Sequence, residues 1–362
     1  MNHADLLRLR LAHQGLTRSA FRKPEDVVAW FGAVQAQDYL GSLWALGSRV
    51  SGATEAEVEA AETRRALVRL WPMRGTLHFV AAEDARWITQ LLAPRIIARN
   101  TARWKRDMDV DAALVARADE VITSSLEGGR RLSREQLYAA LEARRIRTAN
   151  MRGLHILLWL ALKGRLCFAG RNGKQQTFAL LDEWIPKSRQ MDRDTALAEL
   201  ARRYFTSHGP ATLRDFMWWA GLTAKDAQVA LAGAAAELNE ASVYDVRFWW
   251  RDNGSLHRPA RTRRPRVWLL PAFDEYTVAY HDRSILVGAS TARPASKMSL
   301  LNPAVVVDGL VVGSWKRTLA RASVNVDVKL SRELSRPERD ALHDAANVYG
   351  SFLGLEASLR GA

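Results

Sequence analysis

Two glutamines separated by one alanine, Gln35 and Gln37, are the residues of this chain whose type and spacing best suit chemistry. They close an amphipathic helical pattern, and in an extended segment side chains two residues apart point to the same side. We therefore expect both amides to face one substrate atom. An amide cannot act as a real base, so it can orient a reactant but not deprotonate it. The alternative is a pair of solvated glutamines at a helix end.

The composition indicates a soluble globular protein that is attracted to polyanions. A chain of 362 residues favours two or three domains, and 48% hydrophobic with 25% charged residues argues against disorder. The net charge of +14 points first to nucleic acid. Only nine of the 53 basic residues are lysine, and arginine grips phosphate oxygens with two parallel hydrogen bonds. The alternative is that an arginine-rich genome encodes ordinary solvated surfaces this way.

Cysteine and histidine usage argues against a metal site and against disulfides. Cys167 is the single cysteine, and the eight histidines show no zinc-binding spacing, so we expect no metal and no cofactor. The N-terminal residues lack a signal-peptide pattern, and no apolar run reaches the length of a membrane span. We therefore expect a cytoplasmic, nucleoid-associated protein that does not contact membranes.

Helical and strand patterns alternate in a recurring order. The first round has helices over residues 5–16, from Pro24 through Phe31 and over 54–67, followed by strands over 68–72 and 76–80. The second has helices from Ser133 through Leu141 and over 154–162, then strands over 166–168 and 176–181. The third has helices near 196–207, 212–219 and 225–238, then strands near 242–249 and 267–270. Helices followed by a hairpin are typical of a winged helix, and three copies are hard to obtain by chance.

The repeats predict the domain organisation. We expect an α+β, mainly α fold with three tandem winged-helix units, completed by a C-terminal β-hairpin and helix. Asp308 and Gly309 form the expected hairpin turn within residues 305–312, before a strand over 323–330 and a helix from Pro337 to about Leu355. The expected boundaries are 1–110, 111–190 and 191–272 for the three units and 273–362 for the C-terminal region.

Four short segments, in this order, resemble the AlkZ-type winged-helix DNA glycosylases over nearly the whole chain. The first is the Gln-x-Gln run itself, and members of this family related to antibiotic self-resistance carry that form where another branch has Gln-x-Asp. The four are Val34-Gln35-Ala36-Gln37-Asp38, Arg74-Gly75-Thr76-Leu77-His78, Leu269 to Tyr276 with Asp282-Arg283-Ser284, and Val307-Asp308-Gly309 leading to Gly313-Ser314-Trp315-Lys316-Arg317.

The resemblance implies a fold, an activity and two catalytic residues. The family consists of tandem winged helices bent into a C-shape, and it excises alkylated bases, including those in interstrand crosslinks. Alkylation at N7 of guanine leaves a cationic base whose glycosidic bond is already weakened. Water held by the Gln35 and Gln37 carbonyl oxygens beside an oxocarbenium-like transition state would then suffice. No lysine lies near these glutamines in the sequence, which predicts a monofunctional enzyme without Schiff-base chemistry.

Three carboxylates and one arginine are candidates for supporting roles. Asp38 follows the glutamines, where its carboxylate could assist them, but alternation turns it to the opposite face, which favours a cap or backbone partner. Asp274, Glu275 and Arg283 follow a buried-looking strand. Carboxylates that face DNA are costly, so we expect these to orient the glutamines or an arginine, or to form an ordinary buried ion pair.

The candidate DNA contacts lie at turns and in a basic loop over residues 251–266. Each has a plainer alternative: for Trp315 it is packing beneath its hairpin, and for the wing tips it is simple exposure to solvent. Trp219 belongs to an aromatic set expected in the core of the third unit. The candidates are Arg74, Arg171, Lys174, Arg261, Arg263, Arg264, Trp315, Lys316 and Arg317.

The main alternative function is a non-enzymatic DNA-binding protein. Winged helices are commonly transcription factors, so the chain could regulate genes or sequester damaged DNA. A regulator normally dimerises through an exposed amphipathic helix, and the sequence has no heptad run. We therefore expect a monomer that binds damaged double-stranded DNA.

Overall fold

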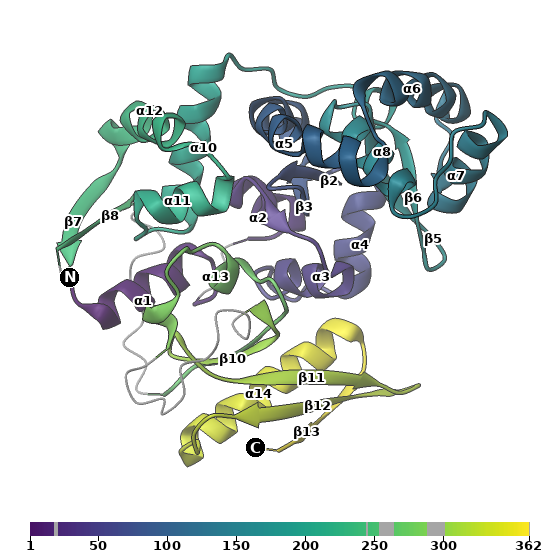
Figure 1. Ribbon diagram of the computed structural model, residues 1–362. Coiled ribbons are helices and arrows are strands. Elements are labelled where there is room, and N and C mark those ends of the chain that lie inside the picture. The colour runs from purple at the N-terminus through teal and green to yellow at the C-terminus, as the bar shows by residue number, and fades with distance from the viewer. Residues whose placement is uncertain (18–20, 244, 253–263, 288–300, 362) are drawn as a thin grey trace. The chain divides into compact units, whose positions relative to one another are not determined.

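The computed structural model describes residues 1–362 except 18–20, 244, 253–263, 288–300 and 362 (Figure 1). The chain divides into two compact units. Unit 1 comprises residues 1–58 and 197–362, and unit 2 comprises residues 59–196. Helices outnumber strands and β-sheets complete the fold, which confirms the expected α+β, mainly α class. The four expected domain segments stay a prediction, because these units are defined by contact density and not by repeats.

The N-terminal part of unit 1 is helical and contains the glutamine pair. It consists of α1 (His3–His13), α2 (Pro24–Phe31), the short strand β1 (Val34–Gln35), α3 (Tyr39–Gly47) and the start of α4 (Glu55–Thr63). Asn2 and Asp5 form a capping box at the start of α1, and Gly32, with φ of +84°, ends α2. This glycine turns the chain out of the helix directly before β1. The sequence did not predict α3, whose residues are buried along most of its length.

A second part of unit 1 joins helices to a short hairpin. It contains α10 (Arg193–Ser207), α11 (Leu213–Ala220), α12 (Ala224–Ala234), the 3₁₀ turn η2 (Ala235–Glu237), β7 (Asn239–Val243) and β8 (Val246–Trp250). We predicted that strands near 242–249 and 267–270 close this round. A strand does occupy Val267–Leu270, but it belongs to the C-terminal sheet, and the stretch near 242–249 contains parts of two strands. β7 pairs with β8, because the chain reverses near Asp245, whose φ is +60°. Ala211 also bridges to Trp249.

The C-terminal part of unit 1 is a five-stranded sheet with a helix packed on it. The strand order is β13 (Glu356–Arg360), β12 (Ser323–Leu330), β11 (Leu310–Leu319), β10 (Ala304–Val307) and β9 (Val267–Leu270). β12 and β13 are parallel and the other pairs antiparallel. The expected turn between β10 and β11 is confirmed: Asp308 and Gly309 have φ of +48° and +95°, as a two-residue hairpin loop requires. The helix α14 (Arg336–Leu353) contacts β9, β12 and β13.

Two short helical segments lie between β9 and β10. α13 (Glu275–Val278) follows β9 after four residues, and the 3₁₀ turn η3 (Ser284–Leu286) comes next. All four residues of α13 are buried. This short helix therefore brings Glu275 into the interior of unit 1.

Unit 2 combines a sheet with helices. Its adjacent strands follow the order β3 (Thr76–Ala81), β2 (Leu67–Met73), β5 (Leu166–Asn172), β6 (Gln175–Leu180) and β4 (Leu132–Ser133). The hairpins β2–β3 and β5–β6 confirm the sequence prediction. Two long helices, α5 (Ala85–Met108) and α6 (Ala112–Leu126), were not predicted. The other elements are η1 (Ala82–Asp84), α7 (Arg134–Ala143), α8 (Arg152–Leu162) and α9 (Leu181–Trp184).

The order helix, short strand, helix, helix, hairpin recurs along the chain. In unit 2 it runs through α6, β4, α7, α8 and the β5–β6 hairpin, with β4 paired to β6. In unit 1 it runs through α10, the bridge at Ala211, α11, α12 and the β7–β8 hairpin. α2, β1, α3, α4, β2 and β3 follow one another in the same order. Among the described residues, no helix is both long and apolar enough to cross a membrane.

Candidate active site

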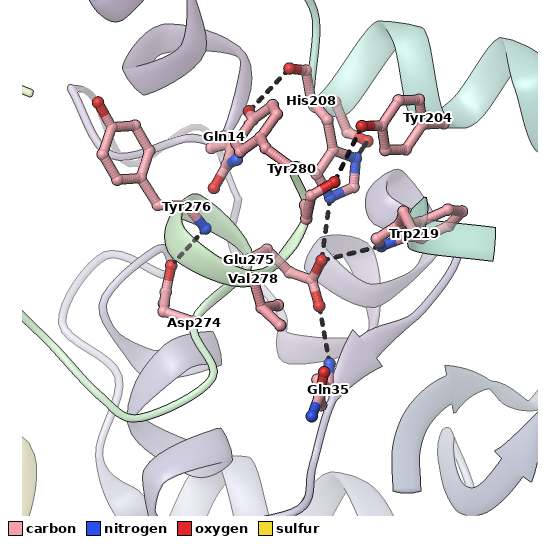
Figure 2. A network of polar contacts seen from close by, with 12 residues as sticks. Gln14, Gln35, Tyr204, His208, Trp219, Asp274, Glu275, Tyr276, Val278 and Tyr280 are labelled. Carbon is pink, nitrogen blue, oxygen red and sulfur yellow. Dashed lines mark hydrogen bonds and ion pairs between the residues drawn. The ribbon is translucent and has the colours of Figure 1, made fainter. Parts of the chain in front are cut away.

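Glu275 connects the glutamine segment to the interior of unit 1 (Figure 2). Its Oε1 accepts a hydrogen bond from the backbone N–H of Gln35 at 2.8 Å. Its Oε2 lies 3.0 Å from Nε1 of Trp219, which donates to it, and 3.1 Å from Nε2 of His208. Glu275 is 1% exposed. A buried carboxyl group with partners on both oxygens holds the backbone of Gln35 in place.

Asp274 fixes the position from which Glu275 projects. Its side chain accepts the backbone N–H of Tyr276 and so caps α13. Both carboxylate oxygens also accept from Arg49, whose Nη1 and Nη2 lie 2.9 and 2.8 Å away. Arg49 and Asp274 are 1% and 0% exposed, so this bidentate ion pair is buried in the interior of unit 1. The sequence left two roles open for Asp274, orienting an arginine or forming a buried ion pair. Its contact with Arg49 has both features.

Arg49 is anchored by further carbonyl groups. Nε donates to the backbone oxygen of Gln14 at 2.9 Å, and Nη1 donates to that of Ala45 at 2.7 Å. Nη2 also donates to Oε1 of Gln14 at 3.2 Å, and Nε2 of Gln14 donates to the hydroxyl of Tyr280 at 3.1 Å. These contacts join α1, the end of α3 and the segment after α13 into one polar network.

His208 lies at the centre of the same network. Its ring stacks on Tyr204 at 4.7 Å between centroids and meets the edge of Phe31 at 5.0 Å. Nδ1 is 2.8 Å from Oγ of Ser207, and the backbone oxygen of His208 accepts from the hydroxyl of Tyr280. Burial lowers the pKa of His208 below its usual value, against the opposing hydrogen bond from Glu275. Burial also raises the pKa of Tyr204 and Tyr280, so both phenols stay neutral.

The two glutamines differ in exposure. Gln35 is 6% exposed and ends β1, whereas Gln37 is exposed and lies at a bend before α3. β1 includes Gln35 but ends before Gln37. The alternation of side chains along a strand therefore does not by itself place the two amides on the same side. Whether they hold one water molecule between them stays a prediction.

Asp38 occupies the N-cap position of α3, as a capping residue would. Its backbone oxygen accepts from Ser42, but its side chain makes no capping hydrogen bond to that helix. The side chain is exposed. A carboxylate at this place faces the positive end of the α3 dipole.

Arg283 does not reach the glutamines through any contact in the described structure. Its Nε and Nη2 donate to the backbone oxygens of Thr277 and Val278, at 2.7 and 3.4 Å. It is 8% exposed and lies 5.4 Å from the ring of Trp218. Burial lowers the pKa of Arg283. Arg283 thus donates to backbone carbonyl groups at the C-terminal end of α13, which have no hydrogen-bond donor within the helix.

The β11 candidates divide by face. Trp315 is 5% exposed, donates its indole N–H to the backbone oxygen of Leu270 and packs edge-on against Tyr349. This is the alternative considered in the sequence, and a side chain packed in this way is not available to a DNA groove. Lys316 is exposed on the opposite face of the strand. Arg317 is half-buried and donates to the hydroxyl of Tyr349.

The remaining candidate contacts lie at turns. Arg74, with φ of +53°, is part of the turn between β2 and β3. Nη1 of Arg171 is 3.1 Å from Oε1 of Glu59, while Lys174 in the adjacent turn is exposed. Arg264 is exposed. Arg261 and Arg263 lie outside the described residues.

His208, Trp219 and Arg49 are site residues that sequence reasoning missed. Trp219 was expected only in a core, and it does lie there at 0% exposure, but its N–H reaches Glu275. No local signal marks Arg49 or His208. Both lie far from Asp274 and Glu275 in the sequence, so only the fold brings them together. Within the described part of the chain, no cluster of three or more His, Cys, Asp or Glu side chains is arranged to hold a metal ion.

Comparison with known proteins identifies the class of this fold. The solved structure of Streptomyces sahachiroi DNA glycosylase AlkZ superimposes with a TM-score of 0.77 over 99% of both chains, at 21% sequence identity. The two chains therefore have the same fold. The family model described as DNA glycosylase AlkZ-like matches residues 28–352. The chain belongs to the AlkZ-like DNA glycosylase family, which implies a DNA substrate.

The sequence is also similar to that of a characterised DNA repair glycosylase. The interstrand DNA cross-link repair glycosylase of Streptomyces sahachiroi is 26% identical over 323 residues, which cover 85% of each chain. The resemblance found in the short motifs is therefore confirmed at the level of the family.

Proposed function

We propose that this protein is a monofunctional DNA N-glycosylase that hydrolyses the glycosidic bond of cationic alkylated purines of the N7-alkylguanine type. The family model supplies the class of reaction, and the Streptomyces sahachiroi relative is an interstrand DNA cross-link repair glycosylase. Unhooking of such cross-links belongs to the same proposal. The protein acts as a monomer on double-stranded DNA and needs no cofactor.

The catalytic residues in this proposal are Gln35 and Gln37. A cationic purine leaves without protonation by a strong acid, so the enzyme has to stabilise a positively charged sugar and orient water. The amide oxygens of the two glutamines are neutral acceptors suited to both tasks. Because an amide cannot deprotonate water, the enzyme acts on activated, positively charged lesions and spares normal bases.

The hydrogen bond from the Gln35 backbone to Glu275 is the observation that carries the proposal. A pair of solvated glutamines at a helix end would need no buried carboxyl group behind it. Glu275 is itself held by Trp219, and Asp274 beside it is held by Arg49. Such a supporting shell is what keeps a reacting group within a fraction of an ångström of its working position.

DNA contacts in this proposal come from exposed basic residues. Lys174, Arg264 and Lys316 are exposed and suit phosphate contacts. The repeated element order and the pairing of β4 with β6 support winged-helix units, in which a short strand after the first helix joins the hairpin. Arg74, Arg171 and Arg317 remain candidates that would have to rearrange their present contacts.

Excision from DNA that contains N7-methylguanine tests the proposal. Abasic sites are revealed by heating with alkali, and single-turnover rates separate chemistry from binding. In Gln35→Ala and Gln37→Ala we expect the rate to fall by about 10² to 10³-fold, as for loss of one transition-state contact, with DNA affinity nearly unchanged. Gln228→Ala, at an exposed position of α12, is the matched control and keeps full activity.

The outcome that contradicts the proposal is equally clear. A wild-type protein that shifts one undamaged promoter fragment and leaves methylated DNA intact is a regulator and not a glycosylase. Full excision by the double variant removes the two glutamines from the mechanism.

A further inference from the structure

Hydrogen-bond geometry around His208 fixes where its protons are. Oγ of Ser207 lies 2.7 Å from the backbone oxygen of Arg203 and 2.8 Å from Nδ1 of His208. A carbonyl oxygen can only accept, so the one hydroxyl proton of Ser207 points to Arg203. The lone pairs of Oγ then face Nδ1. Nδ1 must therefore carry a proton that it donates to Ser207.

This assignment leaves a proton to be found on the other side of the ring. In a neutral imidazole with a proton on Nδ1, Nε2 has only a lone pair. Nε2 faces Oε2 of Glu275 at 3.1 Å, and both groups are almost fully buried. A bare nitrogen and a carboxylate oxygen would repel each other at this distance. One further proton between Nε2 and Oε2 turns that repulsion into a hydrogen bond.

We propose that Glu275 and His208 share this additional proton, and that the shared proton makes the pair a positioning device for Gln35. The inference rests on the proposed function, since it assigns a role to the residues behind Gln35. With the proton on Oε2, Glu275 is a neutral carboxylic acid, whose Oε1 still accepts from Gln35 and whose Oε2 still accepts from Trp219. His208, which lies on α10, is thereby a positioning residue and not a catalytic one.

The surroundings of the pair favour this neutral form. Tyr204 and Tyr280 face His208 as neutral phenols, and Ser207 and Trp219 are uncharged. Charged groups near the pair are themselves paired: Arg49 with Asp274, and Arg10, which lies 3.7 Å from the ring centroid of Tyr280, with Asp215 at 3.9 Å. A buried carboxylate is less well solvated than one in water, whereas an acid that donates to imidazole carries no net charge.

The consequence for activity has a definite sign. The shared proton is present at low pH and is lost as the pH rises through the apparent pKa of the pair, which belongs to both groups together. Loss of the proton sets two lone pairs against each other and displaces Glu275, and with it the backbone of Gln35. Excision therefore falls on the alkaline side, through the rate of the chemical step and not through DNA binding.

Nuclear magnetic resonance of the ring nitrogens tests the proton assignment without any activity. In protein labelled with ¹⁵N-histidine, at neutral pH, the signal of His208 is identified by its loss in His208→Gln. We expect Nδ1 to be protonated. If Nδ1 is unprotonated and Nε2 carries the proton, Ser207 donates to the ring, Glu275 is a carboxylate and the proposal is overturned.

The pH dependence of excision tests the positioning role. Glu275→Gln keeps an acceptor towards Gln35 and a donor towards His208 but cannot titrate. We expect its single-turnover rate at neutral pH to fall about tenfold, as for loss of one supporting contact, with the alkaline decline abolished. Glu275→Ala loses the contact to Gln35 altogether, and we expect a rate lower by about 10²-fold at unchanged DNA affinity.

The experiments distinguish failure of the shared-proton proposal from failure of the proposed glycosylase function. His343→Gln, at an exposed position of α14, keeps the wild-type pH profile. An active wild type whose alkaline decline persists in Glu275→Gln contradicts the shared proton alone. A wild type that excises nothing at any pH contradicts the proposed function, and the proton assignment by resonance still stands or falls by itself.

Discussion

The ion pair of Arg49 and Asp274 is the residue-scale feature on which the site depends most for its stability. Both side chains are almost completely buried, and each nitrogen and oxygen of the pair has a partner in the network. Removal of one partner leaves a charge in the interior without compensation, which is much more costly than the pair is stabilising. The network therefore tolerates substitution of both residues better than substitution of one.

Substitution of Arg49 by methionine tests this reasoning. We expect Arg49→Met to lower the free energy of unfolding by about 3 to 5 kcal/mol, because Asp274 is left as an unpaired buried carboxylate. Arg49→Met combined with Asp274→Asn recovers part of the loss. The measurement is chemical denaturation. Arg8→Met, which removes the solvent-exposed pair with Asp5, changes the free energy by at most about 1 kcal/mol. Equal losses for both arginines would show that burial does not strengthen the interior pair.

Single residues of the site were predictable where the chemistry is local. Gln35 and Gln37 stand out by spacing, and Asp274 and Glu275 by charge after an apolar strand. His208 gives no such signal, because its role comes from Ser207 on one side and from Glu275 on another segment of the chain. A pattern along the sequence does not contain that pairing.

At the scale of elements, the β10–β11 hairpin shows how a turn contributes to the site. Gly309 has φ of +95°, and a Cβ added there would lie 3.0 Å from Cβ of Leu7 and 3.0 Å from the hydroxyl of Tyr276. That hydroxyl donates to the backbone oxygen of Gly309 at 2.8 Å. The turn thus packs against α1 and against α13, the helix that begins with Glu275.

Replacement of this glycine by alanine separates conformational cost from packing cost. We expect Gly309→Ala to lower the free energy of unfolding by roughly 2 to 4 kcal/mol, from the unfavourable φ together with the forced displacement of Leu7 or Tyr276. Gly52→Ala is the control, since Gly52 has φ of +69° and open space around it, and we expect about 1 kcal/mol. Thermal and chemical unfolding give both values. If the two variants are equally destabilised, the close contacts of Gly309 contribute nothing.

Elements were predictable where their signals are short in range. The hairpin at Asp308 and the strands on either side of Gly75 follow from turn chemistry and alternation. The 24-residue helix α5 was missed because Pro94 interrupts its pattern and many charged residues hide its apolar face. The strand β13 was missed because it is short, half-exposed and stabilised by parallel pairing with β12, a contact distant in sequence.

At the scale of the whole molecule, the net charge follows directly from the sequence, whereas the division into two units does not. The boundaries at residues 58/59 and 196/197 fall inside α4 and α10, so no linker composition marks them. The boundary expected after residue 110 falls between α5 and α6, both of which lie in unit 2. The excess of arginine, by contrast, is known from the sequence without the structure, and it bears directly on DNA binding.

A net charge of +14 predicts DNA binding that weakens steeply with salt, because each phosphate contact releases a bound counterion. For an undamaged duplex, we expect the affinity measured by fluorescence anisotropy to fall by about 10³-fold or more between roughly 50 and 200 mM salt, as for six to ten phosphate contacts. The double substitution of Gln35 and Gln37 by alanine leaves the slope unchanged, since amides carry no charge. Lys174→Ala lowers the slope by about one if that lysine contacts a phosphate. A slope near zero would mean that the basic residues serve only solubility, and the exposed lysines and Arg264 would then lose their assignment as DNA contacts.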